Sequence, residues 1–305
     1  MDLRQLRYFL AVAETGHITR AAEALGMQQP PLSQQIRAME EELGIALFHR
    51  HPKGVELTEA GVELRSEAAR LLEDFSAMRS RMQAFVRGER GSIGVGFTSS
   101  AAAHSFTPEV LRLMRKKHPD IQLKVSENNA AEITEAVVAG RLQCGFLRVP
   151  VAQPPGLVFE ALLNEESLLA IPIDHRLARD RTQPVALKAL DGERLVLVRR
   201  PGAPGLYANL LALCAKQKVH VELAAEVERM MTNVNLVAAG VGLSIVPASV
   251  KGAHPDAVVY RKFESSVRLS APLTLVYREV DCEGPMRTFI EMVQKLAQRY
   301  QAAGK

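Results

Sequence analysis

Residues 18–43 read ITRAAEALGMQQPPLSQQIRAMEEEL, and this stretch predicts two short helices separated by a tight turn. The first helix has apolar residues at the i, i+3, i+4 and i+7 positions: Ile18, Ala21, Ala22 and Leu25. Gly26 permits the left-handed backbone that the turn requires. The second helix starts at Pro30 and Pro31 and has an apolar seam of Leu32, Ile36, Met39 and Leu43. Together they predict a helix-turn-helix.

The segments on either side of this motif complete a small domain. Before it, a helix that ends near Gly16 is predicted by the apolar spacing of Leu3, Leu6, Leu10 and Ala13. After it, residues 47–50 and 55–57 flank Pro52-Lys53-Gly54 and predict a hairpin, or wing, with Gly54 at its turn. Thr58 is placed to cap the next helix. We therefore expect a winged helix-turn-helix domain over residues 1–58.

Residues 59–89 form the most regular predicted helix. Its apolar residues are spaced alternately by four and three positions: Leu64, Ala68, Leu71, Phe75, Met78, Met82 and Phe85. A strict period of about 3.5 residues is typical of a helix that faces another helix. We expect a linker helix over residues 59–90 that joins two chains in a dimer. Packing of this helix within one chain is the alternative.

From Ser92 onward, predicted strands and helices alternate, which indicates βαβ units and a largely parallel sheet. The expected strands are 93–97, 121–125 and 142–147 in one lobe and 194–198, 221–227 and 243–246 in the other. A strand at 273–277 and a helix near 285–300 return to the first lobe. The expected fold class is an α/β sensor of two Rossmann-like lobes over residues 91–305, preceded by an all-α winged helix-turn-helix and the linker helix. Lobe I takes about 91–162 and 268–305, and lobe II about 163–267.

The isoelectric point of about 9.0 does not by itself indicate binding to nucleic acid, because the surplus of positive charge lies outside the predicted DNA-binding segment. Residues 1–90 hold 12 Lys and Arg against 13 Asp and Glu, whereas residues 91–305 hold the other 26 against 21. Binding to DNA must therefore be argued from local charge placement. The three cysteines are odd in number and widely separated, a pattern that fits neither a disulfide framework nor a zinc site. With no signal peptide and no apolar span predicted, we expect a cytoplasmic protein without a membrane partner.

The outward face of the second motif helix carries polar groups suited to the major groove. Between residues 28 and 37 the stretch contains one positive charge, Arg37, and no acid. Glutamine amides can pair with adenine edges, and a serine hydroxyl can bind a base or a phosphate. The wing is also basic and free of acids between residues 49 and 53. The predicted DNA-binding residues are Gln28, Gln29, Pro31, Ser33, Gln34, Arg37, Arg50, His51 and Lys53.

The N-terminal residues resemble the DNA-binding region of the LysR family of transcriptional regulators. The matching positions are Leu3, Leu6, Phe9, Thr19-Arg20-Ala21-Ala22-Glu23, Leu25, Gln29-Pro30, Leu32-Ser33, Ile36, Glu40, Leu43-Gly44, Leu47-Phe48, Arg50, Leu57-Thr58 and Ala60-Gly61. The later chain resembles the family's sensor domain at His118-Pro119, Gly140-Arg141-Leu142, Gly145 and 236–247. The resemblance covers essentially the whole chain. It implies a regulator with a sensor built like a periplasmic binding protein, commonly assembled as a tetramer.

This resemblance places an effector between the two lobes, and the local sequence indicates which residues could bind it. The residues that follow the first four strands of the sensor would suit an anion. These are hydroxyls after the first strand, amides after the second, an arginine after the third and small residues after the fourth. They are Thr98, Ser99, Ser100, Asn128, Asn129, Arg148, Gly202 and Ala203. The stretch 96–100 is similar to that of regulators of aromatic degradation. That similarity suggests an aromatic or dicarboxylic acid.

The expected partners are promoter DNA, a small organic anion, a second copy of the chain and RNA polymerase, with no cofactor, metal or catalytic residue. Where family members often carry Arg and Ser, this chain has Gln34 and Gln28, which should reduce phosphate affinity and helix capping. No nucleophile elbow, HExxH motif or complete dinucleotide fingerprint supports an enzyme. A solute-binding protein would not carry a DNA-reading module. A constitutive architectural DNA-binder with a vestigial sensor is the remaining alternative.

Overall fold

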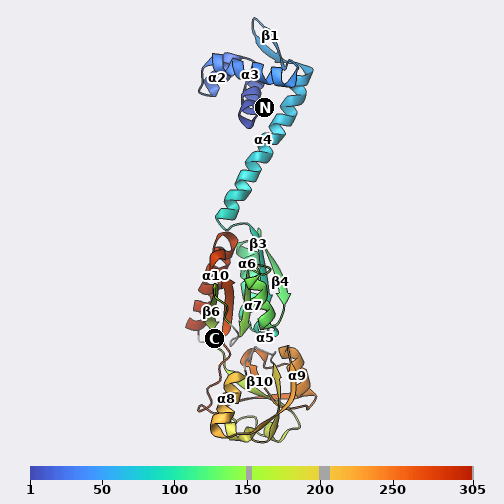
Figure 1. Cartoon of the computed structure of the whole chain (residues 1–305), viewed down its shortest axis with the longest axis vertical. Helices are drawn as coiled ribbons and strands as arrows, with labels where there is room; N and C mark the ends of the chain where they lie inside the picture. Colours follow the sequence, from blue (N-terminus) through green and yellow to red (C-terminus); the bar gives the residue numbers. More distant parts are fainter. Residues whose placement is uncertain (149–152, 199–206, 304–305) are drawn as a thin grey trace. The chain divides into compact units, whose positions relative to one another are not determined.

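The computed structural model describes residues 1–148, 153–198 and 207–303, and the chain divides into two compact units, Met1–Gln83 and Ala84–Lys305. The N-terminal unit is built on three helices (Figure 1): α1 (Leu3–Thr15), α2 (Ile18–Ala24) and α3 (Gln29–Leu43). Their apolar faces meet in one core that includes Leu6, Phe9, Val12, Ala21, Leu32, Ile36 and Met39. Gly16 and Gly26 adopt left-handed backbones after α1 and α2, as the tight turns require.

One position of the predicted α3 seam is wrong. Leu32, Ile36 and Met39 are fully buried, but Leu43 is 42% exposed and lies outside the core. Gly44 ends α3 immediately after Leu43, with φ 68°. The last turn of the helix therefore extends beyond the apolar faces that α1 and α2 supply.

The wing and the long helix follow α3. Strands β1 (Phe48–His51) and β2 (Gly54–Leu57) pair antiparallel, and the Val55 N–H donates to the Gly16 carbonyl at 2.9 Å. The Thr58 hydroxyl accepts from the Gly61 N–H at 3.0 Å, as predicted for a cap of α4 (Glu59–Val86). Along the seam of α4, Ala68 is buried, whereas four larger side chains are exposed in the single chain: Leu71, Met78, Met82 and Phe85.

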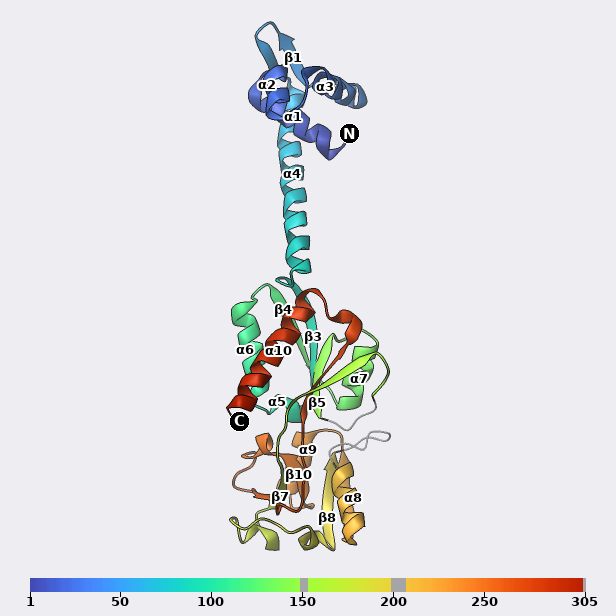
Figure 2. The ribbon, with the colours of Figure 1, turned by 90° about the vertical axis from the view of Figure 1, so that its left-hand side faces the viewer.

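The first lobe of the C-terminal unit is a five-stranded sheet in the order β4-β3-β5-β12-β6. Its strands are β3 (Gly91–Phe97), β4 (Ile121–Glu127), β5 (Cys144–Arg148), β6 (Leu157–Leu163) and β12 (Leu273–Arg278). Apolar side chains bury α6 (Phe106–Lys117) and α10 (Gly284–Ala302) against one face and α7 (Ala130–Val138) against the other (Figure 2). The short helix α5 (Ser99–Ala102) follows β3 directly. As expected, the C-terminal helix completes this lobe.

The second lobe departs from the predicted parallel sheet. Strands β8 (Glu193–Val198) and β9 (Val221–Val227) pair in parallel, but β7 (Ser167–Pro172) is the centre of a separate antiparallel sheet, flanked by β10 (Ser244–Pro247) and β11 (Val258–Lys262). Helices α8 (Ala208–Gln217) and α9 (Met230–Ala238) contribute to different core clusters. Strands β6, β7 and β11 were not predicted. In the described part of the chain, no α-helix directly precedes or follows them, and alternation with helices was the signal that predicted the other strands.

Two chain segments cross between the lobes, and they lie side by side. Glu166 and Ser270 form an antiparallel bridge, and the Ala271 N–H donates to the Glu165 carbonyl at 2.8 Å. The first segment follows β6, and the second precedes β12. Residues 164–166 and 268–272 therefore form a paired connection at which the two lobes are joined.

Candidate DNA-reading surface and ligand site

The outward face of α3 is polar and contains no acid between residues 28 and 37. Ser33 is half-buried, and the other predicted residues are exposed: Gln28, Gln29, Pro31, Gln34 and Arg37. Gln28 is the N-terminal cap by its extended backbone, but its side chain accepts no capping hydrogen bond. Within the described chain, the guanidinium of Arg37 has no hydrogen bond or ion pair. Amide, hydroxyl and guanidinium groups on one helix face can bind base edges and phosphates in a major groove.

The wing presents its three predicted residues on β1 and at its turn. Arg50, His51 and Lys53 are all exposed. The Lys53 N–H donates to His51 Nδ1 at 3.2 Å, which orders the turn. Arg50 Nη2 lies 3.5 Å from Oε2 of Glu40 in α3. This surface carries positive charge suited to the phosphate backbone or a minor groove.

The hydroxyls that precede and open α5 lie where the two lobes meet. Thr98 Oγ1 accepts from the Ala101 N–H at 3.3 Å and lies 3.3 Å from Ser100 Oγ. Ser99 Oγ instead accepts from the Met230 N–H at 3.0 Å, in the first turn of α9 of the second lobe. One predicted ligand-binding hydroxyl is therefore used as a contact between the lobes.

The amides after β4 are also engaged. Asn129 caps α7 by accepting from the Glu132 N–H at 2.9 Å, and its Nδ2 donates to Glu228 of the second lobe at 3.4 Å. Asn128 is half-buried, and its backbone N–H donates to the Phe97 carbonyl. An exposed ion pair, Arg229–Glu127 at 3.0 Å, crosses between the same elements. Asn129, Glu127, Glu228 and Arg229 therefore form a second set of contacts between the lobes. Of these four residues, the sequence predicted only Asn129.

Arg148, at the end of β5, is buried at the paired connection. Its Nη2 lies 2.5 Å from Glu165 Oε2 and donates to the Ser100 carbonyl at 3.3 Å, while Nη1 donates to the Ala271 carbonyl. Nη2 also lies 3.4 Å from the Ser249 hydroxyl, and the Ser249 N–H donates to Glu165 Oε1. Arg148 was predicted to pair with an external anion. In this structure its anionic partner is Glu165, which the sequence did not indicate.

The charges of Arg148 and Glu165 are buried away from water. The side chains of Arg148 and Glu165 are 6% and 9% exposed. Burial lowers the pKa of Arg148, and the negative charge of Glu165 opposes that shift. His104 Nε2 lies 3.9 Å from Glu165 Oε2, and burial lowers the pKa of His104 despite that carboxylate. Such a buried pair tolerates the loss of neither partner.

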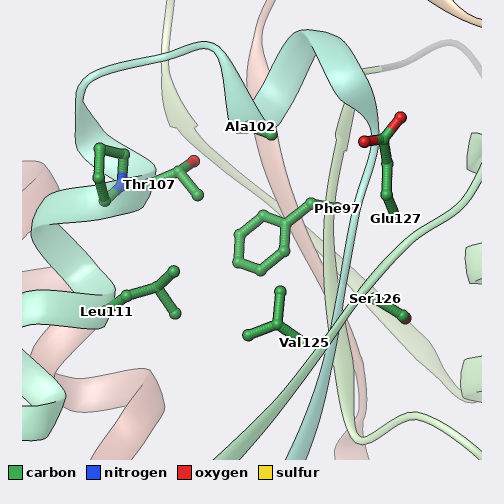
Figure 3. Close-up of a pocket in the computed structure, with 8 residues that line it drawn as sticks. Phe97, Ala102, Thr107, Leu111, Val125, Ser126 and Glu127 are labelled. Atoms are coloured by element: carbon green, nitrogen blue, oxygen red, sulfur yellow. The ribbon is translucent and has the colours of Figure 1, made fainter.

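An apolar pocket of about 270 Å³ opens in the first lobe, lined by residues of β3, β4, α5 and α6 (Figure 3). The Phe97 ring forms part of its wall, together with Leu111 of α6 and Val125 of β4. Glu127 stands at its rim and pairs with Arg229. None of the predicted ligand-binding residues lines this pocket, and its one charged group is a carboxylate.

The structure brings together Thr98, Ser99, Ser100 and Arg148, and it places Asn129 at a separate contact with the second lobe. Gly202 and Ala203 lie outside the described residues. Sequence reasoning missed Glu165, Ser249 and the Met230 N–H. Their partners come from segments far apart in the chain, so no spacing in the sequence could indicate them.

The fold and these surfaces define a class of protein, a DNA-binding regulator with a two-lobed sensor, and comparisons with known proteins agree. The family model described as "Bacterial regulatory helix-turn-helix protein, lysR family" matches residues 3–62, and that described as "LysR substrate binding domain" matches residues 87–298. The chain belongs to the LysR family. It is therefore a LysR-type DNA-binding transcriptional regulator, and the family is not enzymatic.

Relatives match over nearly the whole chain. The HTH-type transcriptional regulator AlsR of Bacillus subtilis (strain 168) is 32% identical over 96% of this chain and 95% of its own length. BudR of Raoultella terrigena is also 32% identical, over 96% of this chain and all of its own. The crystal structure of full-length CbnR complexed with target DNA has a TM-score of 0.77 and 28% identity, and it covers 97% of this chain and 100% of that one.

No helix in the described part of the chain combines the length and the apolar character needed to cross a membrane.

Proposed function

We propose that this regulator reads promoter DNA with α3 and the wing, and that a small anion bound between the lobes of its sensor controls that binding. The exposed, acid-free face of α3 is the observation that carries the proposal, because its side chains are available for a partner. The proposed DNA contacts are Gln28, Gln29, Pro31, Ser33, Gln34, Arg37, Arg50, His51 and Lys53. The structurally similar CbnR forms a complex with its target DNA, which supports the same role.

The proposed effector is an aromatic or dicarboxylic acid. Its binding residues would be Thr98, Ser99, Ser100, Asn128, Asn129 and Arg148, with Gly202 and Ala203 from the other lobe. In support, Nε of Arg148 is buried and has no hydrogen-bond partner among the described residues. Several of these groups now bond across the lobes, so a ligand that took their place would change the relative stability of lobe arrangements.

Self-association is part of the proposal. Exposed apolar side chains at positions 71, 78, 82 and 85 of α4 suit a second copy of the helix. A dimer through α4, assembled further into a tetramer, would present two or more DNA-reading surfaces at once. Contact with RNA polymerase at the promoter completes the proposed set of partners.

Calorimetric titration of the full-length protein with benzoate and with succinate tests the effector. We expect saturable heat with at least one of these acids, and an altered footprint on a duplex selected by the protein from genomic fragments. Ser99→Ala should weaken that binding, whereas Ser92→Ala, an exposed serine at the other end of β3, should not. Absence of heat with both acids would remove this effector class. A footprint that no effector changes would favour the constitutive architectural protein.

A further inference from the structure

One carboxylate connects the wing to α3. Oε1 of Glu40 accepts hydrogen bonds from the backbone N–H groups of Leu47 at 2.9 Å and Phe48 at 3.2 Å. Its Oε2 lies 3.5 Å from Nη2 of Arg50. Leu47 and Phe48 are the residues at which the chain enters β1. A single side chain of α3 therefore holds both the start of the first wing strand and an arginine further along it.

Glu40 differs from the two acids that follow it. Its side chain is only 16% exposed, whereas that of Glu42 is 53% exposed and pairs with the N-terminal ammonium. Glu41 is exposed and bonds to no other side chain in the described chain. Hydrogen bonds to a carboxylate are shorter and stronger than those between neutral groups. Of the three acids, Glu40 is the one whose side chain bonds to the wing.

We propose that Glu40 is a positioning residue for DNA recognition: it fixes the wing relative to the polar face of α3, so that Arg50 and Arg37 reach DNA in register. This rests on the proposed DNA surface. The two surfaces must match one rigid duplex, and groups ordered before binding cost less to order on binding. Other bonds hold the base of the wing as well: the Val55 N–H donates to the Gly16 carbonyl, and the Thr58 N–H and hydroxyl donate to the carbonyls of Leu47 and Ala46.

The pairing also explains why an acid is tolerated near a DNA surface. Arg50 is 38% exposed, so its guanidinium keeps a free side while it lies beside Glu40. The contact at 3.5 Å is long and restrains the side chain without covering it. A phosphate that approached this free side would meet an arginine already restrained in place.

Hydroxyl-radical footprinting of the full-length protein on a duplex that it selects from a random pool tests the proposal. Glu40→Ala should weaken binding about tenfold, the effect of about one charge-assisted hydrogen bond. At saturating protein, protection at the flank contacted by the wing should be lost while protection under α3 remains. A loss of folding would reduce both equally. Glu41→Ala is the matched control and should leave affinity and footprint unchanged.

Glu40→Gln separates positioning from stability. Its amide oxygen can still accept from the two N–H groups, but it offers no charge to Arg50, so we expect the same flank-specific loss at about threefold weaker binding. If Glu40→Ala does not fold, the footprint of Glu40→Gln tests the proposal instead. A folded Glu40 variant with the wild-type footprint and affinity would overturn the inference. If Arg37→Ala also had no effect in this assay, the DNA surface itself would be wrong.

Discussion

Arg37 is the one positive charge on the acid-free face of α3, and it is unpaired within the described chain. A cation that binds a phosphate or a guanine edge contributes to affinity, and at a phosphate it also contributes to salt dependence. We expect Arg37→Ala to weaken operator binding about tenfold. For a phosphate contact, the slope of log affinity against log salt should fall by about one.

Fluorescence anisotropy between about 50 and 200 mM salt measures both quantities. Arg79→Ala, an exposed arginine on α4, removes the same charge and should change neither. An unchanged affinity for Arg37→Ala, with the fold intact, would contradict the proposed reading face. A tenfold loss with no change in slope would assign Arg37 to a base edge instead.

Single residues also mark the limit of sequence reasoning at the ligand site. The exposure of Gln34 and Arg37 follows from the helical period, because burial of one face leaves the other in water. The partner of Arg148 does not follow from any period. Glu165 reaches it only because two crossing segments lie side by side, and that is a tertiary contact.

At the scale of elements, the seam of α4 makes a prediction about assembly. Phe75 is half-buried in the single chain and lies between exposed apolar neighbours on the same seam. Phe75→Asp would bury an unpaired charge between two helices, which costs several kcal/mol, so the dimer dissociation constant should rise more than about a hundredfold. Sedimentation equilibrium measures it. Ser76→Asp places the same charge off the seam and should leave association intact.

An unchanged dissociation constant for Phe75→Asp would show that α4 does not mediate association.

The strands of the sensor show where prediction from sequence patterns fails. Strands that directly precede or follow an α-helix were predicted, with β9 at the expected bounds, whereas β6, β7 and β11 were missed. Short apolar runs in antiparallel sheets carry little periodic signal, and only pairing identifies them.

At the scale of the whole sensor, the Arg148–Glu165 pair links the connection between the lobes to β5. Glu165→Gln would leave a buried guanidinium without its counter-charge, which should lower the free energy of unfolding by about 3 kcal/mol. Adding Arg148→Met should recover part of that loss, because the uncompensated charge is then removed. Urea unfolding of the full chain, followed by circular dichroism, measures both variants.

Glu166→Gln is the control for the same segment. Glu166 pairs with Lys262 at 2.7 Å, but both side chains are largely exposed, so the change should be under about 1 kcal/mol. If Glu165→Gln and Glu166→Gln lowered the free energy of unfolding equally, the buried Arg148–Glu165 pair would contribute no more to stability than an exposed pair. A double variant less stable than Glu165→Gln alone would show that Arg148 is stabilised by its carbonyl partners instead.

The amino-acid sequence by itself determined the helix-turn-helix, the regular seam of α4 and the alternation of strands and helices in the sensor. These depend on periodicity and turn residues, which act over a few neighbouring positions. Only the tertiary structure decided that Glu40 holds the wing, that Ser99 and Asn129 bond across the lobes, and that Glu165 neutralises Arg148. Those contacts join residues from separate segments, and their positions are set by how whole elements pack.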